Sequence, residues 1–509
     1  MKKKNTLLTL LILILLTLVF SIVLIPACSK DPNAGNNNDN NNNNNNNGKQ
    51  GDQQETSEDI QANTEDKLVN YNFNKQEIRI LTSINVSDGF TSNSNYMIEG
   101  TGEITGEAVN DAVYKRNMDV EDLLNVKFKY TQMDEDYGTV EKAMSKIILA
   151  GSDEYDLFIN DIRSIANLSL QGMFQNTKSA GVFELGETYW YKDFMDDVSI
   201  GKDKSFILAG DYFIDILRNC HALFLNKTML EDKTPGALDE LYKKVLDGKW
   251  TMEEFLLLTK SFLADLNGDG KYDKDDQYGF ICYGTWGSAI PFMIASDTNV
   301  ITKDADGIPS LTINNPKSIQ LYDYLKQLYS KDSGCNSQIA VTSVLSEFQN
   351  QRSLMTGLQR LCTLQDLRDM ENEFAILPYP KLNLQQEKYV TSAHDTTEIG
   401  AIPSTTPNFN TICVVLEALN RETKKTVMPV YYGQALKIKY VRDDMSAQII
   451  DLIHDNMRNV FPLAYSEKMS GLLGLYDVTA TKDFASGYEK IAAKAEQNLN
   501  EAIDAFINN

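Results

Sequence analysis

Strand-like and helix-like segments alternate along the first part of the folded chain, and this alternation limits the possible folds more than any other feature. The strand-like segments are rich in β-branched and aromatic residues, and the segments between them carry apolar residues at helical spacing. Strands that alternate with helices in this way form a parallel sheet with right-handed crossovers. We therefore expect an α/β fold. In chain order, the five segments are Ile78–Thr82, Asp111–Asn125, Val126–Tyr130, Val140–Ala150 and Tyr155–Ile159.

Helical patterns dominate the remainder of the chain. Thr251–Glu254 matches a capping box before an apolar run, and Phe484–Ile507 is amphipathic and rich in Ala and Glu. The chain of 509 residues is long enough for two or three domains, so the sequence predicts a helix-rich α/β protein. Further helix-like segments are 318–329, 411–419 and 446–459, and strand-like segments at 280–282 and 374–377 interrupt them.

The N-terminus has the pattern of a secretion signal. Lys2–Lys4 precede an uncharged stretch, Thr6–Ile25, and the segment then ends in Pro-Ala-Cys28. A small residue before Cys, after an apolar run, resembles a bacterial lipobox, whose Cys becomes lipidated after cleavage. We expect residues 1–27 to be a lipoprotein signal peptide and Cys28 to carry the lipid, a palmitate. An uncleaved signal anchor is the alternative.

Residues 28–70 have the composition of a flexible tether. Asn40–Asn47 is an unbroken run of Asn, and Gly, Gln, Asp, Glu and Ser follow it. Such a segment cannot bury enough apolar surface to offset the entropy of ordering. Because it comes directly after the lipobox, we expect it to connect the membrane to the folded body.

The acidic composition excludes one class of partner. Lys plus Arg total 48 and Asp plus Glu total 71, which gives a formal net charge of −23. A surface this acidic repels phosphate backbones, so we expect no nucleic-acid binding. The five cysteines after Cys28 form no CxxC pair, and we expect them to be buried thiols, with at most two disulfides as the alternative.

One acidic loop matches a cation-binding pattern. It fits an EF-hand loop, with side-chain oxygens at positions 1, 3, 5 and 9, and with Gly270 at the sharp turn. Position 12 is Asp276 rather than Glu, and a strand-like segment follows in place of a second helix. We expect a structural calcium ion here, with a metal-free, Asx-rich turn as the alternative. The expected ligands are Asp265, Asn267, Asp269, Lys271 (through its carbonyl), Asp273 and Asp276.

Enzymatic signatures are scarce. The chain has three histidines and no HExxH, GxSxG or Walker A motif. Carboxylate pairs are numerous in so acidic a chain, so a glycosidase dyad stays open, but no particular pair stands out. The sequence therefore favours a binding protein over an enzyme.

An ordered series of segments spans most of residues 71–509. Besides the lipobox, the tether and the Asp265 loop, it consists of Gly106–Asn117, Gly151–Leu157, Phe224–Lys227, Lys249–Thr251, Ile376–Lys381, Gly400–Pro403 and Tyr440–Ser446. In this order, the series resembles the extracellular solute-binding proteins (family 1) of carbohydrate-type ABC importers, in particular the maltose-binding group. The resemblance implies a helix-rich, two-lobed, type II periplasmic-binding-protein-like fold. Its chain would cross the hinge more than once, and its lobes would close over the ligand.

The resemblance also implies how the chain is divided and where it works. Lobe 1 would comprise residues 71–211 and 381–428, and lobe 2 would comprise residues 212–380 and 429–509. The protein would be an extracytoplasmic monomer, lipid-anchored to the cell membrane of a bacterium. It would deliver its ligand to ABC permease subunits.

In this family, ligand contacts come from loops that follow the strands. Asp and Arg side chains there hold hydroxyl groups in pairs, and an aromatic face such as that of Trp286 stacks on a sugar. Trp286 in the core and a solvated Arg163 are the alternatives. The expected ligand is a sugar or an oligosaccharide, with a peptide open, and a surface polysaccharide-acting enzyme or an adhesin is the alternative function. The matching positions are Asn160, Asp161, Arg163, Asp211, Tyr212, Tyr283, Trp286, Gln359 and Arg360.

Overall fold

The structure, a computed structural model, describes residues 67–83, 98–133, 135–367, 369–431, 433, 444–458 and 461–509. The expected signal peptide, Cys28, the tether up to residue 66 and residues 440–443 lie outside these ranges. Within the described residues, no helix has both the length and the apolar character needed to cross a membrane.

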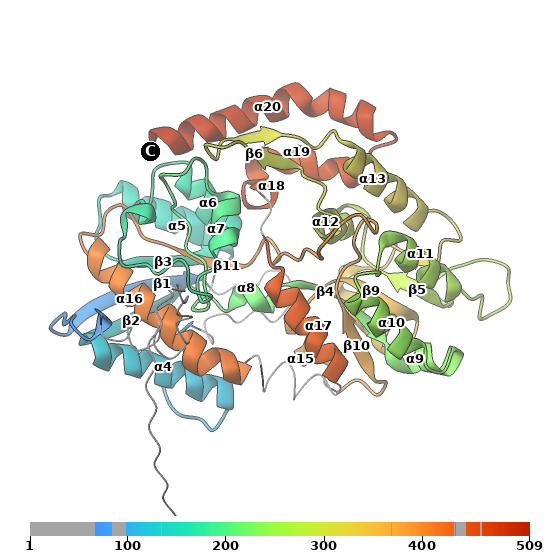
Figure 1. Cartoon of the computed structure of the whole chain (residues 1–509), viewed down its shortest axis with the longest axis horizontal. Helices are drawn as coiled ribbons and strands as arrows, with labels where there is room; N and C mark the ends of the chain where they lie inside the picture. Colours follow the sequence, from blue (N-terminus) through green and yellow to red (C-terminus); the bar gives the residue numbers. More distant parts are fainter. Residues whose placement is uncertain are drawn as a thin grey trace, which may run out of the picture. The chain divides into compact units, whose positions relative to one another are not determined.

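The first sheet is built from the predicted strand–helix alternation. Its strand order is β11-β3-β1-β2, with β1 parallel to both β2 and β3. Its short strand β11 comes from far along the chain and runs antiparallel to β3. The predicted α/β class is therefore confirmed for this part of the chain (Figure 1). The strands are β1 (Gln76–Ser83), β2 (Val126–Met133), β3 (Leu157–Asp161) and β11 (Glu398–Ala401).

Local sequence explains how the helices around this sheet begin and end. Helix α4 (Ala108–Leu124) begins after Glu107, whose side chain accepts a hydrogen bond from the Asn110 amide, and ends at Asn125 in the left-handed conformation. Asp136 caps α5 (Tyr137–Leu149) through the Thr139 amide. Helices α6 (Ile162–Ser169) and α16 (Phe409–Glu422) complete this part of the chain.

The second sheet is mixed, with strand order β10-β4-β9-β5-β8. Strand β5 runs parallel to β8 and β9, whereas β4 runs antiparallel to β9 and β10. The strand predicted at 374–377 is confirmed, and the one predicted at 280–282 begins two residues earlier. The strands are β4 (His221–Asn226), β5 (Tyr278–Ile281), β8 (Cys335–Asn336), β9 (Ser353–Arg360) and β10 (Phe374–Leu377).

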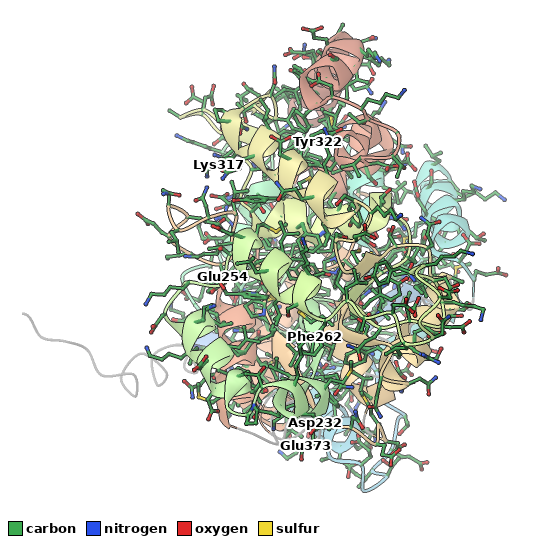
Figure 2. The ribbon with its side chains drawn as sticks, turned by 90° about the vertical axis from the view of Figure 1, so that its right-hand side faces the viewer. Asp232, Glu254, Phe262, Lys317, Tyr322 and Glu373 are labelled. Carbon is green, nitrogen blue, oxygen red and sulfur yellow. The ribbon has the colours of Figure 1, made fainter. Side chains whose placement is uncertain are left out.

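Helices and an aromatic core surround the second sheet. Trp250, Phe255, Phe280 and Phe292 are buried and meet edge to face or at a tilt. Figure 2 shows α13, which carries Lys317 and Tyr322, lying next to the helix that carries Glu254. The helices in this part are α9 (Lys227–Lys233), α10 (Ala237–Leu246), α11 (Met252–Ser261), α12 (Trp286–Ala295), α13 (Pro316–Leu328), α14 (Val344–Gln349) and α15 (Leu364–Leu367).

The predicted capping box of α11 is wrong. Thr251 does precede the helix, but its side chain makes no capping hydrogen bond. Glu254 instead pairs with Lys244 of α10, and the Thr251 backbone bridges to Lys381. Contacts with Lys244 and Lys381 thus take the place of the two capping hydrogen bonds that the local sequence favours.

Two connecting segments run side by side between the sheets. One contains the short helix α8 (Asp215–Arg218) and leads into β4, and the other, residues 389–397, leads into β11. The His221 amide donates to the Ser392 carbonyl at 3.1 Å, and the His394 amide donates to the Asn219 carbonyl at 2.9 Å. The chain therefore passes between the sheets more than once, as predicted. The residue boundaries expected for the two lobes stay predictions.

The C-terminal helix contacts elements associated with both sheets. The ring of Phe506 near its end packs edge to face on Phe206, and Phe484 at its start packs against Tyr322 of α13. Figure 1 shows this helix as the long red element beside α13, α19 and the short strand β6 (Ile301–Lys303). The C-terminal helices are α17 (Asp444–Asp455), α18 (Phe461–Ala464), α19 (Ser466–Leu473) and α20 (Phe484–Asn508).

The five cysteines after Cys28 all lie in the described residues and none forms a disulfide. Cys335 is partly exposed, and the other four are buried. Burial is the main cause that raises the pKa of Cys220 and of Cys413, so these thiols are protonated at neutral pH.

The predicted calcium loop lies between α11 and β5 and is held by its own backbone amides. Asp265 accepts from the amides of Gly268 and Gly270, and Asp276 accepts from those of Leu266 and Asp273. Gly270 has a positive φ of 77°, as the sharp turn requires. Among the described residues, no group of three or more His, Cys, Asp and Glu is arranged to hold a metal ion. Calcium binding stays a prediction.

Removal of calcium is expected to lower the melting temperature of the protein, because the loop carboxylates would lose a shared cation. An ion present at 100 times its dissociation constant contributes about 2.7 kcal/mol. Asp265→Ala should abolish the response to chelator, whereas Asp306→Ala, in another exposed turn, should keep it. Superimposable melting curves of the unaltered protein with chelator and with calcium would refute a structural ion.

Candidate ligand-binding site

Polar residues gather where the ends of four strands approach one another. In the first sheet, Asp161 at the end of β3 pairs with Glu398 at the start of β11. In the second sheet, His221 at the start of β4 pairs with Arg360 at the end of β9. The two connecting segments link these ends. We call the set the crossover cluster: Asp161, Arg163, Asp215, Arg218, Asn219, His221, Arg360, His394, Asp395, Thr396 and Glu398.

Asp161 anchors the side of the cluster that belongs to the first sheet. As the N-cap of α6, its carboxylate accepts from the amides of Arg163 and Ser164, and also from the Ser164 hydroxyl at 2.6 Å. Burial raises the pKa of Asp161, although Arg163 opposes this effect. The preceding residue, Asn160, is fully buried and donates its side-chain amide to the Tyr137 carbonyl at 3.1 Å.

Arg163 is held in place by a ring and two carboxylates. Its guanidinium lies 4.6 Å from the centre of the Tyr137 ring, 3.3 Å from Asp161 and 3.1 Å from Asp395. Burial lowers the pKa of Arg163, but the charges of Asp395 and Asp161 outweigh it and raise that pKa. A quarter of the side chain is exposed, so Arg163 reaches the rim of the cluster.

The segment before β11 supplies a His–Asp pair. The Asp395 carboxylate lies 2.9 Å from Nδ1 of His394 and also contacts Arg163. Burial raises the pKa of Asp395, but His394 and then Arg163 outweigh it and hold the pKa below its usual range. Asp395 is therefore a carboxylate at neutral pH, and it compensates the charge of Arg163.

Asp215 joins the two connecting segments. Its carboxylate accepts from Arg218 at 3.0 Å, from the Asn219 side chain at 2.6 Å and from the Glu398 amide at 3.0 Å. Burial is the main cause that raises the pKa of Asp215, and Arg218 opposes it. Glu398 accepts in turn from Ser83 at the end of β1, at 3.4 Å.

Arg360, the last residue of β9, belongs to the second sheet and contacts residues of both connecting segments. Its Nη1 donates to the Asn219 side chain at 3.0 Å and to the Thr396 hydroxyl at 3.4 Å. Strand β9 has one extra residue opposite β4, next to Leu358, whose φ of 58° is unusual for a non-glycine residue. A bulge of this kind re-aims the following side chains, here Gln359 and Arg360.

His221 is a buried aromatic group of the cluster. Its ring centre lies 5.5 Å from that of His394 and 6.4 Å from that of Tyr379. Burial, and then the charges of His394 and Arg360, lower the pKa of His221 well below its usual value. The ring is therefore neutral at pH 7, with one nitrogen able to accept a hydrogen bond.

Buried polar atoms without a partner mark these strand ends. Each atom below is shielded from solvent and has no hydrogen-bond partner among the residues that the structure describes. Buried polar atoms in proteins are nearly always paired with protein, water or ligand, so an unpaired group of them indicates a place where a polar molecule binds. The atoms are Thr82 Oγ1, Asn160 Oδ1, Arg163 Nη2, His221 Nδ1 and Thr397 Oγ1.

The structure brings together only part of the predicted site. Asn160, Asp161, Arg163 and Arg360 belong to the cluster or touch it, and Gln359 accepts from Thr363 beside it at 3.3 Å. Sequence reasoning missed the residues of the two connecting segments, Asp215, Arg218, Asn219, His394 and Asp395, together with His221 and Glu398. Their only signal in the sequence was that two of the three histidines occur there, one of them next to an Asp.

Tyr212 and Tyr283, also predicted, have contacts with residues that do not belong to the cluster. Tyr212 is fully buried beneath the Arg116 guanidinium, 4.8 Å from its ring centre. Tyr283 is partly buried and bridges to Gln338 through its backbone. Trp286 opens α12, and its side chain is not described. Their role as ligand contacts stays a prediction.

Asp211, also predicted, is fully buried. It accepts from the Tyr191 hydroxyl at 2.8 Å and lies 3.8 Å from Nζ of Lys424. Burial raises the pKa of Asp211 to about 6, although Lys424 opposes this effect. Between about pH 4 and pH 6 the folded state thus binds more protons than the unfolded state, and stability falls as the pH rises through this range.

Asp211→Asn is expected to remove this fall in stability. A shift of about two pKa units corresponds to about 3 kcal/mol. At pH 8 the free energy of unfolding of the variant should therefore exceed that of the original protein by up to this amount. The two should be equal near pH 4. Denaturant unfolding at both pH values measures the difference. The control is Asp193→Asn, which replaces an exposed carboxylate of helix α7 (Lys192–Val198). Equal stabilities of the two proteins at pH 8 would show that ionisation of Asp211 does not lower the free energy of unfolding.

Comparisons with known proteins identify the fold. No protein-family model matches the chain, and no curated protein matches its sequence significantly. Among solved structures, the lacto-N-biose-binding protein of an ABC transporter from Bifidobacterium longum is 12% identical, with a TM-score of 0.54 over 85% of this chain and 98% of its own. An ABC transporter solute-binding protein from Thermotoga lettingae, bound with α-D-tagatose, is 12% identical, with a TM-score of 0.53 over 84% of this chain and 100% of its own.

A third solved structure agrees with these two. The ABC substrate-binding protein from Listeria monocytogenes in complex with cycloalternan is 10% identical, with a TM-score of 0.51 over 84% of this chain and 99% of its own. Each of these chains is covered almost completely, so the similarity extends across both sheets and the connecting segments. The chain therefore has the two-lobed α/β fold of the solute-binding proteins of ABC transporters.

Proposed function

We propose that this protein is the solute-binding component of an ABC importer, and that it captures a neutral carbohydrate at the crossover cluster. The observation that carries the proposal is the group of buried, unpaired polar atoms where the strand ends of the two sheets meet. The fold supports it, because each similar structure above is a binding protein in complex with a sugar. In α/β sheets, ligands bind beyond the carboxyl ends of strands, where Asp161 and Arg360 lie.

The chemistry of the cluster suits hydroxyl groups. Arg163 Nη2 is a donor, Asn160 Oδ1 is an acceptor, and the neutral ring of His221 provides a nitrogen at Nδ1. A sugar hydroxyl both donates and accepts, so one ligand can satisfy all three atoms. Because Asp395 and Asp161 compensate the charge of Arg163, the cluster favours a neutral ligand over an ion.

The position of the cluster suits capture by closure. Its residues come from both sheets and from both connecting segments, so a ligand that bridges them holds the two lobes together. A closed, ligand-bound form would then deliver the sugar to permease subunits. The protein would return its ligand unchanged, since a binding protein performs no chemistry on it.

Lipid anchoring at Cys28 is part of the same proposal and rests on the lipobox pattern. Cys28→Ala should leave the protein unprocessed or release it from the membrane, because the acyl acceptor is lost. Fractionation of cells with mass spectrometry of the mature N-terminus measures this. An intact, non-acylated Cys28 in mature, membrane-bound protein would refute the anchor.

A thermal-shift screen of monosaccharides, oligosaccharides, polyols and small peptides tests the proposed function. A ligand at 100 times its dissociation constant adds about 2.7 kcal/mol to the free energy of unfolding. We expect a sugar to stabilise the protein and to be recovered unchanged by chromatography after long incubation. Stabilisation by peptides alone, or conversion of the sugar into a product, would overturn the proposal.

A further inference from the structure

Helices α18, α19 and α20 contact elements beside both sheets. Helices α18 and α19 lie against α6, which follows β3 of the first sheet. Helix α20 lies against α13 and the short strand β7 (Pro309–Leu311), which both come after α12 in the chain, and α12 packs on β9 of the second sheet. Figure 1 shows α20 reaching from the side of α6 to the side of α13. We call residues 461–509 the C-terminal segment.

The last turn of α20 is attached beside the first sheet. Phe506 and Phe206 are both buried, and their ring centres lie 4.8 Å apart in an edge-to-face contact. Lys204 donates to the Ile507 carbonyl at 2.6 Å, and its positive charge also suits the C-terminal end of a helix. The last turn is therefore held by an apolar contact and by a charged donor.

The partners of this last turn are themselves fixed to the first sheet. Leu170 ends α6, and its carbonyl accepts from the side-chain amide of Asn509 at 2.9 Å. Leu208 follows Phe206 by two residues, and its amide donates to the carbonyl of Gly400 in β11 at 2.8 Å. The last turn of α20 thus holds on to the first sheet through two separate segments.

The start of α20 is attached beside the second sheet. The ring of Phe484 lies 5.6 Å from that of Tyr322 in α13 and 5.4 Å from that of Tyr476. Thr285, which precedes α12, donates its hydroxyl to Asp477 at 2.6 Å. The two ends of the helix therefore belong to different halves of the fold.

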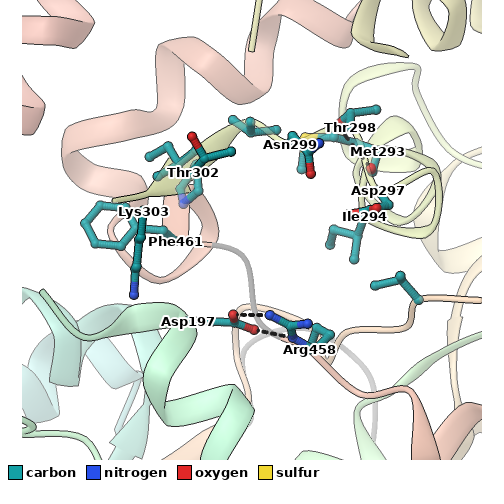
Figure 3. A pocket seen from close by; sticks show the side chains of 14 residues that line it. Asp197, Met293, Ile294, Asp297, Thr298, Asn299, Thr302, Lys303, Arg458 and Phe461 are labelled. Carbon is teal, nitrogen blue, oxygen red and sulfur yellow. Dashed lines mark hydrogen bonds and ion pairs between the residues drawn. The ribbon is translucent and has the colours of Figure 1, made fainter. Parts of the chain in front are cut away.

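The C-terminal segment also borders the space between these halves. A cavity of about 390 Å³ is lined by Asp197 of α7, Ile294 of α12 and Phe461 at the start of α18 (Figure 3). Close to Phe461 in the chain, Tyr465 donates its hydroxyl to the Val198 carbonyl at the end of α7, at 2.9 Å. The segment is therefore one wall of a space whose other walls come from α7 and α12.

The stiffness of α20 has a mechanical consequence. Phe484 and Phe506 lie in one continuous α-helix, and a rise of 1.5 Å per residue places them about 33 Å apart. A helix cannot lengthen without breaking its own backbone hydrogen bonds. If the two lobes move apart, the contacts at one end of α20 must therefore break.

We propose that the C-terminal segment is a strap, which ties the two lobes together away from the connecting segments and restrains their opening. The last turn of α20 is the part that releases first, because one ring pair and two side-chain hydrogen bonds hold it. The start of α20 is held more firmly, by the rings of Tyr322 and Tyr476. The strap does not rest on the proposed function, because no ligand takes part in it.

Hydrogen–deuterium exchange and small-angle X-ray scattering of Phe506→Ala, made in the full chain, test the strap. Loss of the buried ring should raise the exchange rate in residues 502–508 by at least about 10-fold. The radius of gyration should rise above that of the unaltered protein, because the lobes open further. Exchange in residues 484–495 should stay as it is, which separates release of the last turn from unfolding of the helix.

A milder variant keeps the test independent of folding. Lys204→Gln changes a partly exposed side chain and should raise exchange in residues 502–508 by about 2- to 10-fold, the usual loss for one hydrogen bond. It should also raise the radius of gyration. The matched control is Lys494→Gln, since Lys494 is exposed on α20 and bonds Gln497 of the same helix. This control should change neither quantity.

Two results would overturn the strap. Faster exchange in residues 502–508 of both variants with an unchanged radius of gyration would show that the last turn does not restrain the lobes. Unchanged exchange in both variants would show that these contacts do not hold the last turn. If Phe506→Ala does not fold, Lys204→Gln decides by the same two measurements.

Discussion

Replacing Asp215 by Ala is expected to lower the free energy of unfolding by about 3–5 kcal/mol, the usual loss when one partner of a buried ion pair is removed. Asp215 is buried and accepts hydrogen bonds from Arg218, Asn219 and the Glu398 amide. Its removal leaves the buried Arg218 guanidinium without its carboxylate partner. It also breaks the connection between the segment before β4 and the start of β11.

Denaturant unfolding of Asp215→Ala measures this loss. Asp239→Ala is the matched control, since Asp239 is an exposed carboxylate in the first turn of α10. The control should change the free energy of unfolding by no more than about 0.5 kcal/mol. If the two variants were equally stable, Asp215 would not be the residue that joins the connecting segments.

Arg163→Gln is expected to weaken sugar binding by about 10- to 150-fold, since a hydrogen bond to a charged group contributes about 1.5–3 kcal/mol. The variant should remain folded, because the side chain is a quarter exposed and Gln can still lie over the Tyr137 ring. Calorimetry with the sugar found in the screen measures the affinity.

The control for this variant is another partly exposed arginine. Arg352 precedes β9 and donates to the Asp275 carbonyl at 2.8 Å, away from the crossover cluster. Arg352→Gln should bind the sugar as the unaltered protein does. Unchanged affinity in Arg163→Gln would remove Arg163 from the site and favour the alternative in which this side chain is only solvated.

Periodicity in the sequence predicted most strands of the first sheet. It failed for a strand that forms only through contacts with residues far away in the chain. The segments at 78–82, 126–130 and 155–159 each carry a strand-like pattern and form β1, β2 and β3. Strand β11 has only four residues, Glu398–Ala401, and exists because it pairs with β3 more than two hundred residues earlier. No local pattern encodes such a pairing.

The candidate site was predictable to the extent that its residues follow strands. Asp161 and Arg163 come directly after a recognisable strand, so their place at its carboxyl end could be inferred. Asp215, Asn219 and Asp395 lie in segments with no regular pattern, and they reach the cluster because the two connecting segments run side by side. Only the tertiary structure brings these residues together.

Hydrogen–deuterium exchange of the full chain, with and without the sugar found in the screen, tests most directly whether the solute binds at the crossover cluster. Binding there should slow exchange in residues 157–163, 215–221 and 394–398, which come from both sheets and both connecting segments. Exchange in residues 293–303, none of which belongs to the cluster, should change little. Protection confined to residues 293–303, or no protection at the three cluster segments in a sugar-saturated sample, would contradict the account.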